Sequence, residues 1–544
     1  MKSTMMTAQL STNHILERAG KYFGRNEVVG RLPDKSLYRR SYAEIHRRAR
    51  QLAQALQRRG IERGEAVATL CWNHAWHLEA YFGIPAAGAV LHTLNLRLAP
   101  EELAYIIENA EDKAILVDDV LLPIWEKVRP LLKTAPDVIV VPYSGAAVPD
   151  GYENYEDFIA ADASGFRYID QDENEAVGMC YTSGTTGRPK GVVYSHRSMV
   201  MHAVAGCMPN LFSVANGDRI LLVTPMFHAN AWALPFSALM VGANLIMPGP
   251  HMQGDDLLEL MEKEKINTAV GVPTIWTMLL DTLERAGRER TLDLVKPIKM
   301  LVGGAAVPVS MVTNFAKYDM HIVQGWGMTE TSPIGSFPIV KPEHRHLPES
   351  EQHALRAMQG NASPLVDMRI MDEEGNEQPW DGRTPGEIQV RGPWITGGYH
   401  KYPDGDLSKF TADGWLRTGD VGTIDAEGYM RIVDRSKDMI KSGGEWISSV
   451  QLENLLVGHP EIADAAVVAI PHPKWDERPL VVAVRRPQST VDAGALRDYL
   501  LPHLARFQVP DDFEFVEALP RTPTGKVLKY VLRDTYKDRK SLSQ

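Results

Sequence analysis

The chain has 544 residues, of which 44% are hydrophobic and 23% charged, proportions that are ordinary for a globular protein. This length exceeds what one hydrophobic core supports, so we expect more than one domain. The formal net charge of −11 at pH 7 argues against nucleic acid as the main partner, because phosphate backbones are bound by basic surfaces.

The cysteines and the chain ends bear on localisation. Cys71, Cys180 and Cys207 give neither a disulfide framework nor a zinc-binding spacing, and this favours a reducing compartment. No apolar stretch reaches the length of a membrane span. The first ten residues lack the apolar core of a signal peptide, and the last residues are not a peroxisomal Ser-Lys-Leu. We therefore expect a cytoplasmic protein without a transmembrane segment.

The N-terminal two thirds of the chain alternate short β-rich runs with amphipathic helices. A helix is predicted between Ser41, which can form a capping box with Glu44, and Gly60, which is placed to end it. The alternation predicts α/β layers with largely parallel sheets. The predicted strands are 67–70, 114–117, 138–141, 176–180, 220–225, 244–247, 268–272 and 299–302.

The pattern changes after about Glu351. Strands at 368–371, 387–391 and 429–433, separated by Gly, Asp and Pro turns, predict a small antiparallel barrel or sheet. The charged run 434–438 is a predicted linker. An α+β pattern follows, with helices at 450–457 and 493–503, strands at 465–470 and 481–485, and a final helix after Gly525. We expect one domain over residues 1–435 and a smaller one over residues 436–544.

The most informative motif is the run Thr182-Ser-Gly-Thr-Thr-Gly-Arg-Pro-Lys-Gly191, which follows an apolar strand. Its glycines allow close backbone approach, and its hydroxyls, N–H groups and Lys190 can converge on a polyphosphate. The run is not a Walker A loop, because no Gly-Lys-Ser/Thr ends it and Pro189 lacks the N–H that a helix there would need. Taken alone, it could equally be a polar turn.

Further runs place small or polar residues after predicted strands. Glu330, near phosphates, would indicate a divalent cation, since like charges otherwise repel. Asp420, which we expect in a turn between strands, could accept hydrogen bonds from ribose hydroxyls. Each residue also has an ordinary structural interpretation: His228 as a satisfied polar group, Trp232 as core, and each lysine as a solvated charge. The runs are Pro225 to Trp232, Leu301 to Pro308, Gln324 to Thr331, Thr418 to Asp420, Lys441 to Trp446 and Pro523 to Lys526.

Taken together and in this order, the motifs resemble the adenylate-forming superfamily of acyl-CoA synthetases, adenylation domains and firefly-type luciferases. The resemblance covers nearly the whole chain. Runs 441–449 and 469–475 are most similar to bacterial medium- and long-chain fatty acyl-CoA synthetases, and relatives that activate methylthiopropionate share much of the pattern. The resemblance implies a large N-terminal domain of α/β layers with a small β-barrel subdomain, followed by a small mobile α+β C-terminal domain.

The resemblance implies two half-reactions that use ATP, Mg²⁺ and CoA. A carboxylic acid first forms acyl-AMP and releases pyrophosphate, and the CoA thiol then displaces AMP. Lys526 matches the lysine that bridges the carboxylate and the α-phosphate. Thr182 and Glu330 match the Mg²⁺ contacts, and Lys437 matches the hinge about which the small domain rotates.

The same matching gives the remaining site residues. Those matching nucleotide- and CoA-binding positions are Thr182, Ser183, Gly184, Thr185, Thr186, Gly187, Lys190, Gly304, Ala305, Ala306, Gln324, Gly325, Trp326, Gly327, Met328, Thr329, Asp420, Arg435, Lys437, Lys441, Gly443, Gly444, Glu445 and Trp446. Those matching acyl-pocket positions are His228, Trp232, Gly303, Gly327 and Pro333. His228 would stand between the acyl pocket and the CoA tunnel, Trp232 would act as a gate, and Lys441 would line the thioester-forming site. Trp326 departs from the tyrosine frequent at its position.

The leading hypothesis is an ATP-dependent acyl-CoA ligase acting on a medium- or long-chain fatty acid. The same reaction on a short thioether acid or an aryl acid is the alternative within this class. A carrier-loading acyl-AMP ligase and a luciferase-type oxygenase are alternatives from other classes. The resemblance also implies a homodimer by analogy.

Overall fold

The computed structural model describes residues 1–182, 188–286, 293–401, 407–443, 445–521 and 527–539. Within these residues, two seven-stranded sheets form the N-terminal part. The first has the order β14 (Met320–Gln324), β13 (Ile298–Val302), β12 (Thr268–Gly271), β10 (Arg219–Leu222), β11 (Asn244–Met247), β1 (Glu27–Arg31), β2 (Leu37–Ser41). The second has the order β7 (Glu153–Asn154), β6 (Asp137–Val141), β5 (Ala114–Asp118), β3 (Ala66–Leu70), β4 (Val90–Thr93), β8 (Ala176–Tyr181), β9 (Gly191–Ser195).

Both sheets are parallel except at one edge, where β2 pairs antiparallel with β1 and β9 pairs antiparallel with β8. Most of their strand residues are buried, as expected for parallel sheets covered by helices. This confirms the predicted α/β layers. The α-helices in the described residues are α1 (Thr12–Tyr22), α2 (Tyr42–Arg59), α3 (Ala75–Ala86), α4 (Pro100–Ala110), α5 (Leu122–Val128), α6 (Tyr155–Phe158), α7 (His196–Gly206), α8 (Leu234–Val241), α9 (Gly254–Lys263), α10 (Pro273–Ala286), α11 (Val309–Ala316), α12 (Glu349–Arg356), α13 (Ser449–Val457), α14 (Ala493–Leu500) and α15 (Lys529–Tyr536).

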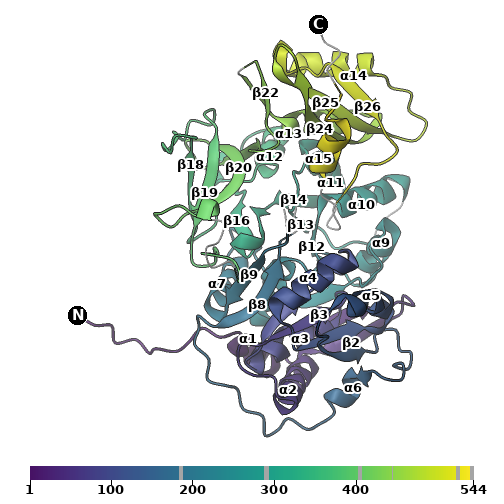
Figure 1. Ribbon diagram of the computed structural model, residues 1–544, viewed down its shortest axis with the longest axis vertical. Coiled ribbons are helices and arrows are strands. Elements are labelled where there is room, and N and C mark those ends of the chain that lie inside the picture. The colour runs from purple at the N-terminus through teal and green to yellow at the C-terminus, as the bar shows by residue number, and fades with distance from the viewer. Residues whose placement is uncertain (183–187, 287–292, 402–406, 444, 522–526, 540–544) are drawn as a thin grey trace.

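Antiparallel sheets follow the two large sheets along the chain. One consists of β15 (Trp326–Gly327), β16 (Ile334–Phe337) and β17 (Asn361–Ala362), and the other of β18 (Asp367–Met371), β19 (Gly386–Arg391), β20 (Leu416–Ile424) and β21 (Met430–Arg435). The second sheet, in green, lies to one side of the molecule between the N-terminal and C-terminal parts (Figure 1). The second sheet occupies the region where the sequence predicts a small barrel or sheet, whereas the sheet of β15, β16 and β17 was not predicted.

The C-terminal part forms a separate group of elements at one end of the molecule (Figure 1). Its sheet contains β23 (Glu445–Ile447), β22 (Ile440–Ser442), β25 (Asp476–Arg485), β24 (Ile462–His472) and β26 (Asp512–Phe515). Helices α13 and α14 pack on one apolar cluster of this sheet and α15 on another. It therefore has a hydrophobic core of its own, as an α+β unit requires.

Several local predictions need correction. Thr418 to Asp420 lie inside strand β20 and not in a turn. Asp434 and Arg435 belong to strand β21 and not to a linker. The strand predicted at 220–225 ends at Leu222, and the helix predicted at 493–503 ends at Leu500, followed by a 3₁₀ turn. No helix in the described ranges is long and apolar enough to cross a membrane.

Candidate active site

The two ends of the glycine/threonine loop are joined by two hydrogen bonds, each donated by a backbone N–H. The Thr182 N–H donates to the Lys190 carbonyl at 3.0 Å, and the Lys190 N–H donates to Thr182 Oγ1 at 3.1 Å. The loop thus connects the antiparallel strands β8 and β9, not a strand and a helix as in a Walker A motif. Ser183, Gly184, Thr185, Thr186 and Gly187 lie outside the described residues.

Tyr399 connects this loop to Glu330. Its hydroxyl donates to Glu330 Oε1 at 2.8 Å, and the Lys190 ammonium lies 5.0 Å from the centre of its ring. The structure therefore brings Lys190 and Glu330 to the same place, as the sequence predicts. Tyr399 itself was missed, and its only sequence signal is its position in Gly397-Gly-Tyr-His400.

The oxygens present here suit a magnesium ion. Glu330 is 7% exposed, and its carbonyl accepts a hydrogen bond from the Thr396 N–H at 2.8 Å. The neighbouring Thr329 is also held in place, because its carbonyl oxygen accepts a hydrogen bond from the Tyr194 hydroxyl at 2.9 Å. Mg²⁺ is bound through carboxylate and other hard oxygen atoms together with substrate phosphates. Glu330 and the Thr182 hydroxyl supply such atoms.

The small residues predicted to contact adenine lie where β13 and β14 end. The three small residues Gly304, Ala305 and Ala306 are exposed. The next residue, Val307, is held by the buried Gln324 side chain, whose Oε1 accepts from the Val307 N–H at 3.2 Å. Gly325 donates its N–H to the Val302 carbonyl at 2.8 Å. The carboxyl ends of parallel strands are the usual ligand-binding edge of such sheets.

Asp420 and Arg435 lie opposite each other on β20 and β21. Arg435 Nε is 2.5 Å from Asp420 Oδ1, and the indole N–H of Trp326 donates to Asp420 Oδ2 at 2.8 Å. Both residues predicted to bind ribose are thus adjacent, and Trp326 joins them from another sheet. The sequence gives no signal for this hydrogen bond.

His228 precedes a strained turn, and Trp232 lies within it. Ala229, Asn230, Ala231, Trp232 and Ala233 all have φ between 42° and 59°, the left-handed region that costs a residue with a Cβ roughly 1–2 kcal/mol each. Asn73 holds the start of this segment, because its Oδ1 accepts from the Met226 N–H at 2.7 Å. Such strain is concentrated at functional sites.

Trp232 lies against the segment predicted to contact adenine. Its side chain is 8% exposed and its ring centre is 6.2 Å from that of Phe212. A Cβ added at Gly303 would lie only 3.0 Å from the Trp232 indole and 3.1 Å from the Gly325 carbonyl oxygen. The indole therefore occupies the space beside Gly303, next to the residues that follow β13 and β14.

A small cavity brings His228 and Thr182 together. Thr93 and Asn95, at the end of β4, also line it, as do Tyr181 and Phe227. The sequence does not single out Thr93 or Asn95. Gly327, the residue after Trp326, lies against Pro333, since a Cβ at Gly327 would collide with the Pro333 carbonyl. Met328 accepts a hydrogen bond from the Thr331 hydroxyl at 3.1 Å.

The residues predicted for the CoA step lie in or beside β22 and β23 of the C-terminal sheet, which is separate from the sheet that carries Asp420 (Figure 1) and from the 3₁₀ turn that carries Glu330. Lys441, Glu445 and Trp446 are exposed, and the Lys441 ammonium lies 5.3 Å from the centre of the Trp446 ring. Gly443 has φ +61°, and a Cβ there would lie 2.7 Å from the Trp475 ring, so a glycine is required.

Lys437, the predicted hinge, lies between the two parts of the chain. Gly444 and Lys526 lie outside the described residues. Lys437 is exposed just beyond β21, next to Ser436, whose N–H donates to the Gly419 carbonyl at 3.1 Å. The chain therefore passes from the green sheet to the C-terminal sheet at this point.

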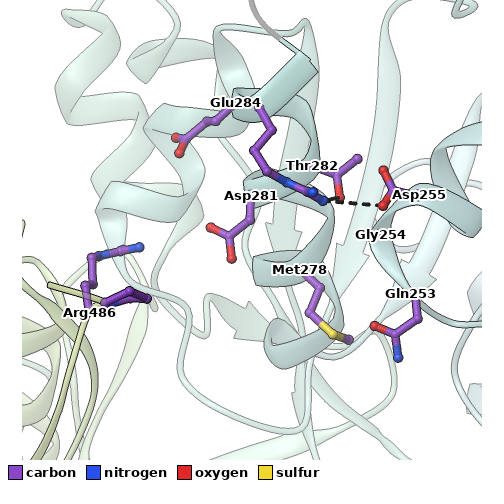
Figure 2. Close-up of a pocket in the computed structure, with 10 residues that line it drawn as sticks. Gln253, Gly254, Asp255, Met278, Asp281, Thr282, Glu284 and Arg486 are labelled. Carbon is purple, nitrogen blue, oxygen red and sulfur yellow. Dashed lines mark hydrogen bonds and ion pairs between the residues drawn. The ribbon is translucent and has the colours of Figure 1, made fainter.

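A larger cavity, of about 680 Å³, lies elsewhere. Figure 2 shows it between α9 and α10 on one side and Arg486 of the C-terminal part on the other. Its lining includes the acidic residues Asp255, Asp281 and Glu284. Among the predicted active-site residues that the structure describes, none lines this cavity, and we interpret it as a groove between the two parts of the chain.

Cys71, His74 and Asp118 are buried and lie close enough together to hold a metal ion. The hydrogen bonds argue against one. His74 Nδ1 accepts from the His77 N–H at 3.0 Å, so a neutral His74 carries its proton on Nε2 and donates it to Asp118 Oδ1 at 2.7 Å. A protonated nitrogen cannot ligate a metal, and we interpret this cluster as structural.

The comparisons with known proteins agree with this geometry. The model of the AMP-binding enzyme family matches residues 16–400, and the model of the AMP-binding enzyme C-terminal domain matches residues 451–526. The structure of ATP-bound MatB from Rhodopseudomonas palustris superposes with a TM-score of 0.81 at 28% sequence identity, covering 97% of this chain and 99% of that chain. The fold of an adenylate-forming enzyme is thereby confirmed.

Two curated relatives match over almost their whole length. The long-chain-fatty-acid–CoA ligase of Thermus thermophilus is 47% identical over 537 residues, which are 98% of this chain and 97% of the relative. The 3-methylmercaptopropionyl-CoA ligase of Ruegeria pomeroyi is 42% identical over 542 residues, which are 99% of each chain. The chain belongs to the AMP-binding enzyme family, and the resemblance inferred from its motifs is confirmed.

Proposed function

We propose that this AMP-binding enzyme activates a medium- or long-chain fatty acid with ATP and transfers the acyl group to CoA. The reaction class, ATP-dependent ligation of a carboxylic acid to the CoA thiol with Mg²⁺, agrees with both curated relatives, which are named CoA ligases. The structural observation that carries the proposal is the meeting of Lys190, Tyr399 and Glu330. It supports the proposal because the Lys190 ammonium, which could bind phosphates, and the buried Glu330 carboxylate, which could bind the metal, both contact Tyr399.

The residues then divide between the two half-reactions. A carboxylate oxygen of the acid attacks the α-phosphorus of ATP, and the bond from that phosphorus to pyrophosphate breaks. Lys526 would neutralise the charge of the two anions as they meet. Asp420 and Arg435 would hold the ribose. In the second step the CoA sulfur attacks the acyl carbon and AMP leaves, with Lys441 and Gly443 lining that site.

The domain boundary proposed at residues 435/436 is supported by the sheets. The last strand of the green sheet ends at Arg435 and the first of the C-terminal sheet begins at Ile440. Asp434, at the end of the green sheet, accepts from the Ser449 N–H at 2.6 Å, so contact across the boundary occurs close to the proposed hinge residue Lys437. A rotation about this point is a hinge-type step between half-reactions.

Two further properties are part of the proposal. We place the enzyme in the cytoplasm, supported by the three free cysteines and by the use of ATP and CoA. We also propose that it forms a homodimer, by analogy with similar ligases.

The substrate is tested by measuring AMP release with ATP, Mg²⁺ and CoA across straight-chain acids from C4 to C16, with methylmercaptopropionate and benzoate alongside. We expect the highest kcat/KM among the medium- or long-chain acids. A higher value for methylmercaptopropionate would support the second candidate, which the 42% identical relative of that name favours. AMP release that does not depend on CoA would contradict the ligase assignment.

Replacing Trp232 by alanine should broaden this chain-length profile and leave the KM for ATP little changed. The indole fills the space beside Gly303, and an apolar pocket discriminates by only about 1–3 kcal/mol per methylene, so its loss removes much of that selectivity. If the indole acts only as core, the variant should instead lose roughly 3–5 kcal/mol of stability with an unshifted profile. Thermal melts beside the C4-to-C16 panel distinguish the two results.

A further inference from the structure

The indole of Trp326 holds the carboxylate of Asp420. The hydrogen bond from Trp326 Nε1 to Asp420 Oδ2 is 2.8 Å long, and the two residues are 7% and 3% exposed. Water therefore competes weakly for this acceptor, and a hydrogen bond to a charged group is stronger than one between neutral groups. The other oxygen, Oδ1, faces Arg435 Nε at 2.5 Å. One partner on each oxygen fixes the plane of the carboxylate.

Both members of this pair are themselves fixed. A Cβ added at Gly335 would lie 2.3 Å from the Trp326 ring, so the indole rests directly on the backbone of β16. The Asp420 N–H donates to Thr418 Oγ1 at 3.1 Å, and that hydroxyl donates to the Ile388 carbonyl at 2.7 Å. The indole N–H thus joins two separate antiparallel sheets at one defined point.

We propose that Trp326 is a positioning residue for ATP, whose N–H aims the Asp420 carboxylate at the ribose hydroxyls. The inference rests on the proposed role of Asp420. Each carboxylate oxygen has two acceptor positions, so Oδ1 and Oδ2 each keep one for a ribose O–H after bonding Arg435 and Trp326. A phenylalanine at position 326 keeps an aromatic face for the adenine ring but has no N–H to hold the carboxylate.

The test compares ATP with 2′,3′-dideoxy-ATP in wild type, Trp326→Phe and Asp420→Asn, using pyrophosphate exchange at saturating acid. We expect Trp326→Phe to raise the KM for ATP about tenfold or more, the effect of losing a hydrogen bond to a charged group. Its kcat should change less than about threefold, and its KM for the acid should not change. With the dideoxy nucleotide, wild type and Trp326→Phe should have the same KM. Because each variant is measured with both nucleotides, a partly unfolded preparation does not alter the ratio of its KM for ATP to its KM for 2′,3′-dideoxy-ATP.

Three outcomes would overturn the inference, and they are distinguishable. If wild type uses both nucleotides equally well, Asp420 does not bind the ribose, and the proposed role fails together with the inference. If wild type discriminates and Asp420→Asn does not, but Trp326→Phe discriminates as wild type does, the ribose role stands and the inference is wrong. If Trp326→Phe weakens both nucleotides equally, the indole acts through adenine or the fold and not through Asp420. The variant Gly335→Ala, which displaces the indole without removing its N–H, should lower the discrimination between the two nucleotides as Trp326→Phe does.

Discussion

Replacing Lys526 by alanine should lower the rate of acyl-adenylate formation by a factor on the order of 10²–10³, the range found when a transition-state donor is removed. The lysine ends the Pro-Thr-Gly-Lys run of the C-terminal part, and in the proposed function its charge acts where a carboxylate and a phosphate meet. Thioester formation from preformed acyl-AMP should change little, since the proposal assigns that step to the other domain orientation. Pyrophosphate exchange measures the first step, and CoA-dependent release of AMP from acyl-AMP measures the second.

A matched control for this variant is Lys537→Ala. Lys537 is an exposed lysine of the same C-terminal part, at the end of α15, so its removal changes the net charge equally and should leave both steps intact. Equal loss of both half-reactions in Lys526→Ala would contradict the proposal that Lys526 serves the first half-reaction and Lys441 the second.

Helix-capping residues and apolar spacing are sufficient to predict a helix that is determined by residues close together in the sequence. The helix predicted after Ser41 is α2, with the capping box between Ser41 and Glu44 and a left-handed Gly60 at its end. Helix α1 was not predicted. It buries Ile15, Leu16 and Ala19 against α2 and α8, and the Ser11 side chain caps its N-terminus, so its apolar face and its N-cap are local signals that the sequence does carry.

The error at Thr418 to Asp420 comes from a bulge inside a strand. Gly and Asp are typical of turns, but β20 continues through them and pairs with β21 at Asp420. On the β19 side the register shifts between Glu387 and Gln389, opposite these residues, and Gly419 has φ +74°, so the turn-forming residues make a bulge and do not end the strand. As a result Asp420 is fixed on a strand, which holds a binding carboxylate more firmly than a turn would.

The site residues themselves could be predicted from motifs, but the contacts among them could not. Trp326 and Asp420 are separated by 94 residues, and Tyr399 and Glu330 by 69. Each hydrogen bond depends on how distant segments of the chain pack, which no spacing in the sequence encodes. The motifs therefore give the residues that we propose meet the nucleotide, and the structure shows which side chains contact these residues.

Replacing Lys441 by alanine should give the reverse of the Lys526 pattern. Lys441 is exposed on β22 of the C-terminal sheet, beside the obligatory glycine at 443, and its main-chain N–H is held by Glu477 Oε2 at 2.8 Å. Its ammonium is thus available to a ligand that reaches this face. We expect pyrophosphate exchange to be retained and CoA transfer to fall about 10- to 100-fold, the effect of losing a hydrogen bond to a charged group.

The control for Lys441 is Lys474→Ala, because Lys474 is also exposed and also lies over a tryptophan, with its ammonium 4.5 Å from the centre of the Trp475 ring. If CoA transfer depends on Lys441 specifically, the Lys474 variant should keep it. The same loss in both variants would mean that the positive charge of this face, and not Lys441, attracts the anionic CoA. Unchanged thioester formation from acyl-AMP in Lys441→Ala would instead remove the lysine from the second half-reaction, and the other exposed residues of this sheet, Glu445 and Trp446, would be the next to test.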